Sequence, residues 1–411
     1  MNKADSDRLE NALEQLGLEN STSRNDADIV VLNTCVVRQN AENKAVGTLT
    51  SLKPYKEKNP DKIIALMGCM VGPNSENLKK QFPYVDVFMR PQEYDPLLDL
   101  LSERMKIDVA GCIGPLSAPA DISTFVPIIH GCDKFCSFCI IPYRRGREKS
   151  RTIPDISDEV LRLVNRGVKE VTLLGQNVDS YGHDLSGNIN LSDLLTELNQ
   201  INDLSRIRFL TSHPNDMDDR IIDAVSNLDK VCENINLPFQ AGDDEILKSM
   251  RRGYTNQEYR NLIEKIRNRV PDISLSTDLI VGFCDENDKQ FGETLKLIED
   301  IEFDKVHSAS YSTRKGTIAD RKMTDNVPEE IKKERLHIIN DAQEKICAKI
   351  NNRLIGSETE ILVEGKKEDR WYGRNRNDKI VFVDSPDMIL GSMLTVKIEQ
   401  SSPWYLEGSI S

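Results

Sequence analysis

The chain has 411 residues, a net charge of −13 at pH 7, 38% apolar residues and 29% charged residues. This composition is typical of a globular protein with two or three domains. There is no run of eighteen apolar residues, and the first thirty residues are polar and acidic, which excludes a membrane span and a secretory signal. Nine cysteines in such a chain indicate a reducing compartment, where clustered thiols favour metal or redox chemistry over disulfides. We therefore expect a cytoplasmic protein.

Buried apolar runs alternate with polar, helix-like segments in residues 1–105. This alternation predicts an N-terminal parallel α/β sheet domain. A long polar helix is expected between the first two runs, at about residues 41–58. Cys35 and Cys69 directly follow these two runs, at the edge where open α/β sheets bind ligands. The three predicted strands are Ile29–Leu32, Ile63–Met67 and Val85–Phe88.

A linker is predicted at residues 106–124, which are rich in Gly, Pro, Ala and Ser. Strand–helix alternation resumes over residues 125–350 and favours a partial (βα)6 barrel, whose site lies at the carboxyl ends of its strands. A charged helix from residue 328 to about 351 leads out of this domain. The predicted strands are Val126–Ile129, Glu170–Leu174, Arg206–Leu210, Asn234–Leu237, Ile273–Val281 and Lys305–Ser308.

The last part of the chain, residues 351–411, has short β-rich runs separated by Gly, Asn, Asp and Pro. This pattern predicts a small antiparallel barrel or sandwich. The runs are Thr359–Val363, Lys379–Val383 and Leu394–Ile398. The fold class expected for the whole chain is therefore α/β with a small C-terminal β-domain.

Three cysteines follow the first strand of the predicted barrel with the spacing C-x3-C-x2-C: Cys132, Cys136 and Cys139. One interpretation is a zinc site completed by His130, although a separation of two residues from Cys132 is tighter than zinc sites use. A [4Fe–4S] cluster suits three thiolates better, because cysteine is its normal ligand. With four irons and three cysteines, one iron stays open to bind a substrate.

This loop resembles that of the radical S-adenosylmethionine enzymes, which carry the same spacing at the same place in a partial (βα)6 barrel. The resemblance implies that the open iron is chelated by S-adenosylmethionine. It also implies that one electron from the cluster cleaves this sulfonium to methionine and a 5′-deoxyadenosyl radical, which abstracts hydrogen. In such enzymes the cofactors carry the difficult chemistry, and the protein orients them and excludes water.

Further strings over nearly the whole chain, in the right order, resemble the methylthiotransferase family, and the C-terminal β-domain resembles its TRAM RNA-binding module. Within the family, GQNVDSYG and TSHP look most like the branch that methylthiolates N6-isopentenyladenosine beside the tRNA anticodon. The branch that acts on threonylcarbamoyladenosine in tRNA is the main alternative. The strings are NTCVVR (33–38), GCM (68–70), IIPYRRGREKSR (140–151), LLGQNVDSYG (173–182), TSHPNDM (211–217), LPFQAGDDEILKSMRRGYT (237–255), STDLIVGF (276–283) and YSTRKGTIA (311–319).

The resemblance implies a second [4Fe–4S] cluster in the N-terminal domain that carries the sulfur to be inserted. Two of its three cysteines match Cys35 and Cys69. The third belongs to a G-C-Q-M-N string whose tail resembles Met1-Asn2, so we expect the first strand and its cysteine to be missing from this chain. Cys112 in the linker is an alternative third ligand. Three other cysteines are expected to be small buried side chains: Cys232, Cys284 and Cys347.

Further residues at predicted strand ends match positions that hold S-adenosylmethionine or line the cavity in the family. The alternative interpretation is that these residues form ordinary turns and hydrogen bonds. For Arg314, the alternative is an ordinary position on the surface. The string GFCDEN (282–287) departs from the family's GFPGE, which puts an adenine contact there in doubt. The candidate cofactor-binding residues are Gly175, Gln176, Asn177, Gln240, Asp278 and Arg314.

Basic residues are locally concentrated despite the net negative charge, and only local patches matter for phosphate binding. We expect them to bind the tRNA, with a solvated charged face as the alternative. Trp371, Tyr372 and Trp404 supply aromatic rings suited to RNA, unless they pack in a core. The candidate RNA-binding arginines are Arg144, Arg145, Arg147, Arg151, Arg374 and Arg376.

The expected partners are a tRNA with N6-isopentenyladenosine, an electron donor of flavodoxin or ferredoxin type and a sulfur donor, with the protein a monomer. Two other classes of protein stay open. One is an RNA-binding form that lacks sulfur transfer, and the other is a zinc-stabilised binding module without catalysis.

Overall fold

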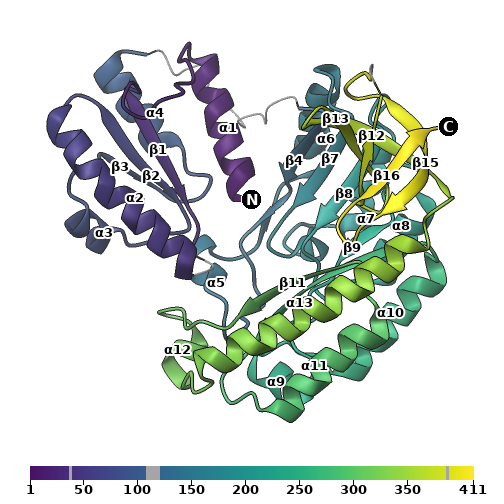
Figure 1. Ribbon diagram of the computed structural model, residues 1–411. Coiled ribbons are helices and arrows are strands. Elements are labelled where there is room, and N and C mark those ends of the chain that lie inside the picture. The colour runs from purple at the N-terminus through teal and green to yellow at the C-terminus, as the bar shows by residue number, and fades with distance from the viewer. Residues whose placement is uncertain (37–38, 108–120, 386–387) are drawn as a thin grey trace. The chain divides into compact units, whose positions relative to one another are not determined.

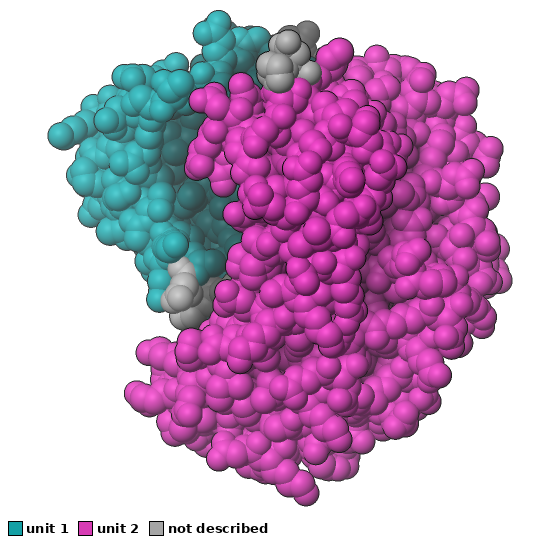
Figure 2. All heavy atoms as spheres, turned by 45° about the vertical axis from the view of Figure 1, so that its right-hand side comes forward, with its two compact units in different colours: residues 1–119, 130–149, 314–321 teal, residues 120–129, 150–313, 322–411 magenta. Residues whose placement is uncertain are grey.

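The computed structural model describes residues 1–36, 39–107, 121–385 and 388–411. The chain forms two compact units, coloured separately in Figure 2. The first contains residues 1–119, 130–149 and 314–321, and the second contains 120–129, 150–313 and 322–411. This division separates the cysteine loop from the rest of the predicted 125–350 domain. Most of the predicted 106–124 linker, with Cys112, lies outside the described residues, as do Val37 and Arg38 of the NTCVVR string.

The first unit contains a three-stranded parallel sheet in the order β1-β2-β3, made of β1 (Ile29–Thr34), β2 (Ile63–Gly68) and β3 (Val87–Met89). All six residues of the central strand β2 are buried, whereas β1 is an edge strand with five half-buried residues. The predicted N-terminal parallel sheet is confirmed, and each of its strands overlaps a predicted apolar run.

Four helices cover the two faces of this sheet (Figure 1). Ile63, Ala65 and Met67 of β2 face one core, and the alternate residues Ile64 and Leu66 face the other, as strand periodicity requires. α1 (Asn2–Gln15) and α4 (Asp95–Met105) pack on the first face, while α2 (Gln39–Lys58) and α3 (Glu76–Gln81) pack on the second.

The second unit contains six parallel strands in two sheets, ordered β4-β7-β8 and β9-β10-β11. A parallel bridge between Ile207 and Val231, and a hydrogen bond from Ser212 N to Asn236 O (3.0 Å), join β8 to β9. The strand order of the predicted partial barrel is therefore confirmed. The strands are β4 (Ser123–Pro127), β7 (Glu170–Leu174), β8 (Arg206–Leu210), β9 (Asn234–Asn236), β10 (Ser274–Val281) and β11 (Lys305–Ser310).

Amphipathic helices follow the barrel strands, as expected for βα units. Several begin with side-chain caps: Asn190, Thr255 and Asn287 each form a capping box. The helices are α6 (Ile153–Asn165), η2 (Val178–Ser180), α7 (Leu191–Asn199), α8 (Asp219–Asn227), α9 (Asp244–Ser249), α10 (Asn256–Arg269), α11 (Asp288–Ile301) and α13 (Glu329–Asn352). Four short elements complete the middle of the chain: β5 (Ile129–His130), α5 (Ile141–Arg145), β6 (Lys149–Ser150) and α12 (Ile318–Lys322).

The C-terminal residues form a closed five-stranded barrel in the order β12-β13-β14-β16-β15. It is a barrel rather than a sandwich, and β14 pairs with β16 in parallel while the other pairs are antiparallel. Sequence patterns missed β13 and β16 because their residues are largely polar or glycine. The strands are β12 (Glu358–Lys367), β13 (Arg370–Asn375), β14 (Ile380–Val383), β15 (Met393–Ser401) and β16 (Leu406–Ile410).

Candidate functional site

The three-cysteine loop connects β5 to α5 and is closed by backbone hydrogen bonds. Cys132 N donates to Gly146 O (3.2 Å), and Cys139 N donates to Cys136 O (3.1 Å). Gly131 has a φ of 72°, and a Cβ there would lie 2.0 Å from Arg147 O. The start of the loop therefore requires glycine.

Side chains and a neighbouring segment hold this loop from both sides. Phe135 adopts the left-handed region (φ 48°), and its ring packs edge-on against Tyr143, with centroids 5.9 Å apart. The guanidinium of Arg147 lies over the Phe135 ring, 5.5 Å from the ring centroid. Ala319 of α12 donates its N–H to Ser137 O (2.8 Å). These contacts shape the loop.

The donor set of this loop fits a cubane cluster with an open iron. None of the eight described cysteines forms a disulfide, and burial raises the pKa of Cys132 to about 11, so an unliganded thiol stays protonated until a metal displaces the proton. Within the described ranges, no group of three His, Cys, Asp or Glu side chains could hold a single metal ion. Cubane cysteines each bind a different iron and need no such convergence. The zinc alternative with His130 therefore gains no support.

Cys35 and Cys69 follow β1 and β2 directly, as predicted. The register pairs Thr34 with Gly68, so the two cysteines leave neighbouring strands at the same edge. Cys69 N donates to Thr34 O (3.0 Å), and Thr34 Oγ1 donates to Met67 O (2.8 Å). The structure thus brings these two thiols to one place from distant parts of the sequence.

Arg145 is a residue of this second thiol site that the sequence did not reveal. Its Nε donates to Cys69 Sγ (3.3 Å), and its Nη2 donates to Asn2 Oδ1 (2.8 Å) and Asp5 Oδ2 (3.2 Å). The side chains of Arg145 and Asp5 are each only 1% exposed. The predicted phosphate contact of Arg145 stays untested, and its guanidinium is buried on protein partners in this structure.

The other arginines after the loop differ in exposure. Arg147 is 73% exposed and pairs with Asp133 (2.8 Å). Arg151 is less exposed and is held by Glu159 (2.6 Å), and Arg144 is half-buried. Phosphate binding by these three stays a prediction, and Arg147 is the most accessible of them.

Arg374 and Arg376 are half-buried in a network between the C-terminal barrel and the barrel strands of the second unit. Arg374 contacts Glu170 (2.6 Å), which also accepts from Arg208 (2.9 Å). Burial alone would raise the pKa of Glu170, but Arg208 and Arg374 hold it below its ordinary value. Arg376 forms a two-oxygen pair with Glu233 at 2.7 Å. The structure thus favours a docking role for both arginines over their predicted contact with RNA.

Gly175, Gln176 and Asn177 follow β7, at the carboxyl edge of the barrel strands. A Cβ at Gly175 would lie 2.5 Å from Ile129 Cγ2, so the close approach of β7 to β5 requires glycine. Asn177 is buried and donates to Asp216 Oδ2 (2.5 Å), while Gln176 is half-buried. Their predicted contact with S-adenosylmethionine is untested.

Gln240 and Asp278 meet at the same edge, after β9 and within β10. Gln240 has a φ of 71°, and its N–H donates to Asp278 O (3.0 Å). The Asp278 carboxylate accepts from Asn236 Nδ2 (3.1 Å). Arg314 belongs to the first unit, where it is buried and pairs with Glu42 (3.6 Å). A role of these three residues toward the cofactor stays a prediction.

A buried carboxyl joins two of the motif strings in a way that the sequence did not predict. Asp179 of GQNVDSYG accepts from Ser212 Oγ (2.9 Å) and His213 N (3.0 Å) of TSHPNDM. Burial raises the pKa of Asp179 to about 7. The two strings therefore form one structural feature beside β7 and β8.

The backbone conformation explains how the GFCDEN string (282–287) accommodates Asp285 where the family has glycine. Asp285 occupies the position of the family's second glycine, and it adopts a left-handed φ of 65°, which Asp tolerates better than most residues. Its N–H donates to Asn326 Oδ1 (2.9 Å). Glu286 accepts from Gly282 N (2.6 Å) and pairs with Arg335 (2.8 Å).

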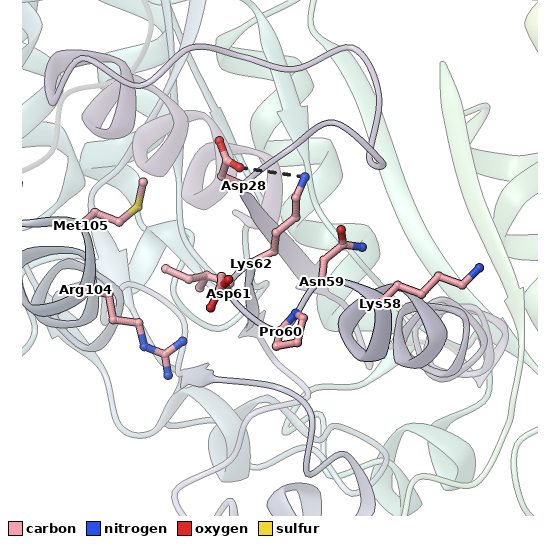
Figure 3. A pocket seen from close by; sticks show the side chains of 9 residues that line it. Asp28, Lys58, Asn59, Pro60, Asp61, Lys62, Arg104 and Met105 are labelled. Atoms are coloured by element: carbon pink, nitrogen blue, oxygen red, sulfur yellow. Dashed lines mark ion pairs between the residues drawn. The ribbon is translucent and has the colours of Figure 1, made fainter.

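One hollow of about 400 Å³ lies at the amino ends of β1 and β2 (Figure 3). Asp28 and Lys62 form an ion pair of 3.9 Å in it, and Arg104 of α4 also lines it. Cys35 and Cys69 follow the opposite, carboxyl ends of the same strands. We therefore assign this hollow no part in the thiol chemistry.

Three family models match the chain. The Radical SAM superfamily matches residues 126–298, the Uncharacterized protein family UPF0004 matches residues 1–90, and the TRAM domain matches residues 352–411. The barrel and its three-cysteine loop thus define a radical S-adenosylmethionine enzyme.

Relatives that align over the full length of the chain show which family of radical enzymes it belongs to. A tRNA-2-methylthio-N(6)-dimethylallyladenosine synthase from Dehalococcoides mccartyi is 48% identical over 410 residues, covering 100% of this chain and 96% of the relative. The enzyme of the same name from Herpetosiphon aurantiacus is 43% identical over 416 residues, covering 100% and 95%. The chain belongs to the tRNA-2-methylthio-N(6)-dimethylallyladenosine synthase family.

A solved structure supports the fold alone. The radical S-adenosylmethionine methyltransferase TsrM from Kitasatospora setae matches with a TM-score of 0.55 at 16% identity, covering 74% of this chain and 71% of TsrM.

Membership of the radical enzymes implies S-adenosylmethionine and a [4Fe–4S] cluster as cofactors. The residues fit this cluster, and Cys132, Cys136 and Cys139 would hold it. Among the described residues, no helix is long and apolar enough to span a membrane.

Proposed function

We propose that this protein converts N6-isopentenyladenosine beside the tRNA anticodon into its 2-methylthio derivative. The carrying observation is the full-length identity of 48% to a relative named for this product. The preserved three-cysteine loop of the radical enzymes adds to it. A tRNA loop suits the reaction, because its bases unstack easily and can enter an active site.

In this proposal the barrel edge holds S-adenosylmethionine through residues that follow its strands. Gly175 leaves room beside Ile129, and Gln176 and Asn177 would bind the amino group. Gln240 and Asp278 would line the cavity, and Arg314 would bind a carboxylate or phosphate. When bound, the cluster and S-adenosylmethionine supply the radical that takes hydrogen from C2 of the adenine, and a second S-adenosylmethionine supplies the methyl group.

Cys35 and Cys69 would hold a second [4Fe–4S] cluster, which would supply the sulfur. Their neighbouring strand ends and the buried hydrogen-bond donors beside Cys69 support this assignment. Two thiolates hold a cubane poorly, so a third ligand is required; Cys112 lies outside the described residues and stays one candidate. An electron donor of flavodoxin or ferredoxin type and a sulfur donor complete the reaction.

The C-terminal barrel would bind the tRNA through aromatic and basic side chains. Trp404 is 59% exposed. Phe382 packs edge-on against Tyr405 at 5.4 Å, and Arg370 lies 5.3 Å from the Phe382 ring centroid. Base–aromatic stacking and cation–π contacts suit single-stranded RNA.

The test is an anaerobic assay with iron- and sulfide-loaded protein, dithionite, S-adenosylmethionine and tRNA from cells that lack methylthiolation. We expect 2-methylthio-N6-isopentenyladenosine among the digested nucleosides and 5′-deoxyadenosine in solution. A product formed only with threonylcarbamoyladenosine tRNA would favour the other tRNA branch. 5′-Deoxyadenosine without either product would favour a form that lacks sulfur transfer, and binding of tRNA without 5′-deoxyadenosine would contradict catalysis.

A further inference from the structure

Gln240, which follows β9, has a backbone conformation that a glutamine rarely adopts. Its φ is 71°, and the N–H of Ala241 donates across it to the carbonyl of Phe239 (3.0 Å). These two features define the γ-turn of positive φ, which is rare and strained for a residue other than glycine. Gln240 lies at the carboxyl edge of the barrel strands, where such folds bind their ligands. Strain that is kept at this edge points to a function.

The neighbouring strand β10 holds this turn through hydrogen bonds. The N–H of Gln240 donates to Asp278 O (3.0 Å), and the carbonyl of Gln240 accepts from Ile280 N (3.0 Å). Two residues earlier in the same segment, Phe239 and Leu237 are tied to the Thr277 hydroxyl. The backbone on both sides of the strained residue is therefore fixed to β10.

A second set of contacts comes from two buried side chains in the segment between α9 and α10. The Tyr254 hydroxyl donates to Phe239 O (2.8 Å), the same carbonyl that closes the γ-turn. Arg252 Nη2 donates to Pro238 O (2.9 Å), and Arg252 Nε donates to the Tyr254 hydroxyl (3.0 Å). Arg252 and Tyr254 are only 5% and 9% exposed. The two side chains thus hold the carbonyls of the two residues that precede Gln240.

The TSHPNDM string (211–217) anchors these two side chains in turn. Asn215 Nδ2 donates to Arg252 O (3.1 Å), and the His213 ring packs edge-on against Tyr254, with centroids 6.0 Å apart. Gly253 has a φ of 74°, and a Cβ there would lie 2.9 Å from Asn215 Nδ2. The ends of β8 and β9 and the start of α10 therefore share one support for Gln240.

We propose that Arg252 and Tyr254 are positioning residues, which hold Gln240 in its strained turn so that its side-chain amide binds the adenosine part of S-adenosylmethionine. An amide both donates and accepts hydrogen bonds, which suits the ring nitrogens and hydroxyls of an adenosine. This inference rests on the cofactor contact of Gln240 in the proposed function and adds the residues that aim it. A tRNA also contains adenosines, so the test measures the two ligands separately.

The test measures the equilibrium binding of S-adenosylmethionine to the full chain, loaded with iron and sulfide and kept without a reductant so that no cleavage occurs. Gln240→Ala should weaken binding about tenfold, which corresponds to ~1.4 kcal/mol of lost hydrogen bonding. Tyr254→Phe removes only the hydroxyl and should weaken binding about three- to tenfold. In the Gln240→Ala background, Tyr254→Phe should have no further effect, because Tyr254 acts through Gln240. An equal effect in both backgrounds would overturn the positioning role.

Tyr84→Phe is the matched control, because the Tyr84 hydroxyl also donates to a backbone carbonyl, that of Leu49 (2.8 Å), in the N-terminal sheet domain. This variant should bind S-adenosylmethionine as the wild type does. Binding of tRNA should be unchanged in the Gln240 and Tyr254 variants, and a loss of tRNA binding alone would overturn the assignment to S-adenosylmethionine.

The strain has a readout that needs neither cluster nor cofactor. Gln240→Gly should unfold at a higher urea concentration than Gln240→Ala, because glycine adopts a positive φ without strain. Equal or reversed midpoints would overturn the strained turn. If Tyr254→Phe fails to fold, Arg252→Lys replaces it in the comparison of the two backgrounds.

Failure of this inference can be told apart from failure of the proposed function. A wild-type chain that does not bind S-adenosylmethionine would overturn both. Binding by Gln240→Ala as tight as that of the wild type would overturn the inference and leave the radical reaction standing. Weakened binding by Gln240→Ala together with unchanged binding by Tyr254→Phe would overturn only the positioning role.

Discussion

The two thiol sites differ in how the chain builds them. Cys132, Cys136 and Cys139 lie in one short loop closed by its own backbone hydrogen bonds. Cys35 and Cys69 come from two strands and become neighbours only through the register that pairs Thr34 with Gly68. A site built from one loop is visible in sequence spacing, whereas a site assembled from separate strands depends on the fold. The two should therefore respond differently to substitution.

The largest effect is expected in the loop site. Cys136→Ala removes one of three cluster ligands, and two thiolates hold a cubane poorly, so we expect cleavage of S-adenosylmethionine to be abolished. Chromatography of 5′-deoxyadenosine and iron analysis measure this. Cleavage retained at the wild-type rate would refute the assignment of the loop.

The assembled site should separate the two halves of the reaction. We expect Cys69→Ala to retain 5′-deoxyadenosine formation and to lose the methylthiolated nucleoside, because the radical cluster keeps its three ligands. Cys232→Ala is the control and should keep both products, since Cys232 is buried in the second unit, to which neither thiol site belongs. Equal loss of both products in Cys69→Ala would contradict the prediction that the two thiol sites have separate functions.

A second assembled feature is the network around Glu170. Its carboxylate is fully buried between Arg208 and Arg374, so Glu170→Gln should destabilise the protein by about 3–5 kcal/mol, as when one partner of a buried ion pair is removed. Urea unfolding at pH 7 measures this. Because the folded pKa of Glu170 lies below its ordinary value, its contribution is present above about pH 4.3 and is lost as the pH falls through the folded pKa. A variant as stable as the wild type at pH 7 would contradict the network's role.

Asp179 should give the opposite pH dependence. Its folded pKa of about 7 lies above the ordinary value, so its contribution to stability is full below about pH 3.9 and declines as the pH rises to 7. We expect Asp179→Asn to flatten this decline, so that the variant gains relative to the wild type between these values. Unfolding midpoints across the range test it, and parallel pH profiles would count against the prediction.

The smallest effect is expected on tRNA binding, from a substitution at the exposed Arg147 after the cysteine loop. Arg147→Gln should weaken tRNA binding modestly and lower the salt slope of log K by ~0.7–0.9 if one phosphate contact is lost. Filter binding at several salt concentrations measures this. Lys248→Gln, at a side chain that is 79% exposed on α9, is the control, and equal slopes for all three proteins would remove Arg147 from the RNA contact.

The sequence predicted those parts whose signal is local. Apolar runs located β1, β2 and the six barrel strands, and spacing located the cysteine loop. The strands β13 and β16 were missed because RWYGRN and LEGSI lack an apolar pattern. A small closed barrel can be built from such strands, since only their inward residues need to be apolar.

Side chains whose surroundings come from distant segments could not be predicted. Arg145 looks like one more basic residue in YRRGREK, and only the fold brings it to Cys69 and Asp5. Arg374 and Arg376 also looked like phosphate ligands until the fold supplied Glu170 and Glu233 as partners. A sequence shows which residues are charged, but it does not show which residues pair with them in the fold.

The outer side of β1 has a practical consequence for handling the protein. Among the described strands β1 pairs only with β2, and a groove of about 750 Å³ runs beside it, lined by Leu9 and Leu13 of α1 and by Ile29 and Val31. Unpaired backbone groups next to apolar side chains form a template on which another β-segment adds. We therefore expect concentrated samples of the 411-residue chain to self-associate through this described edge of β1.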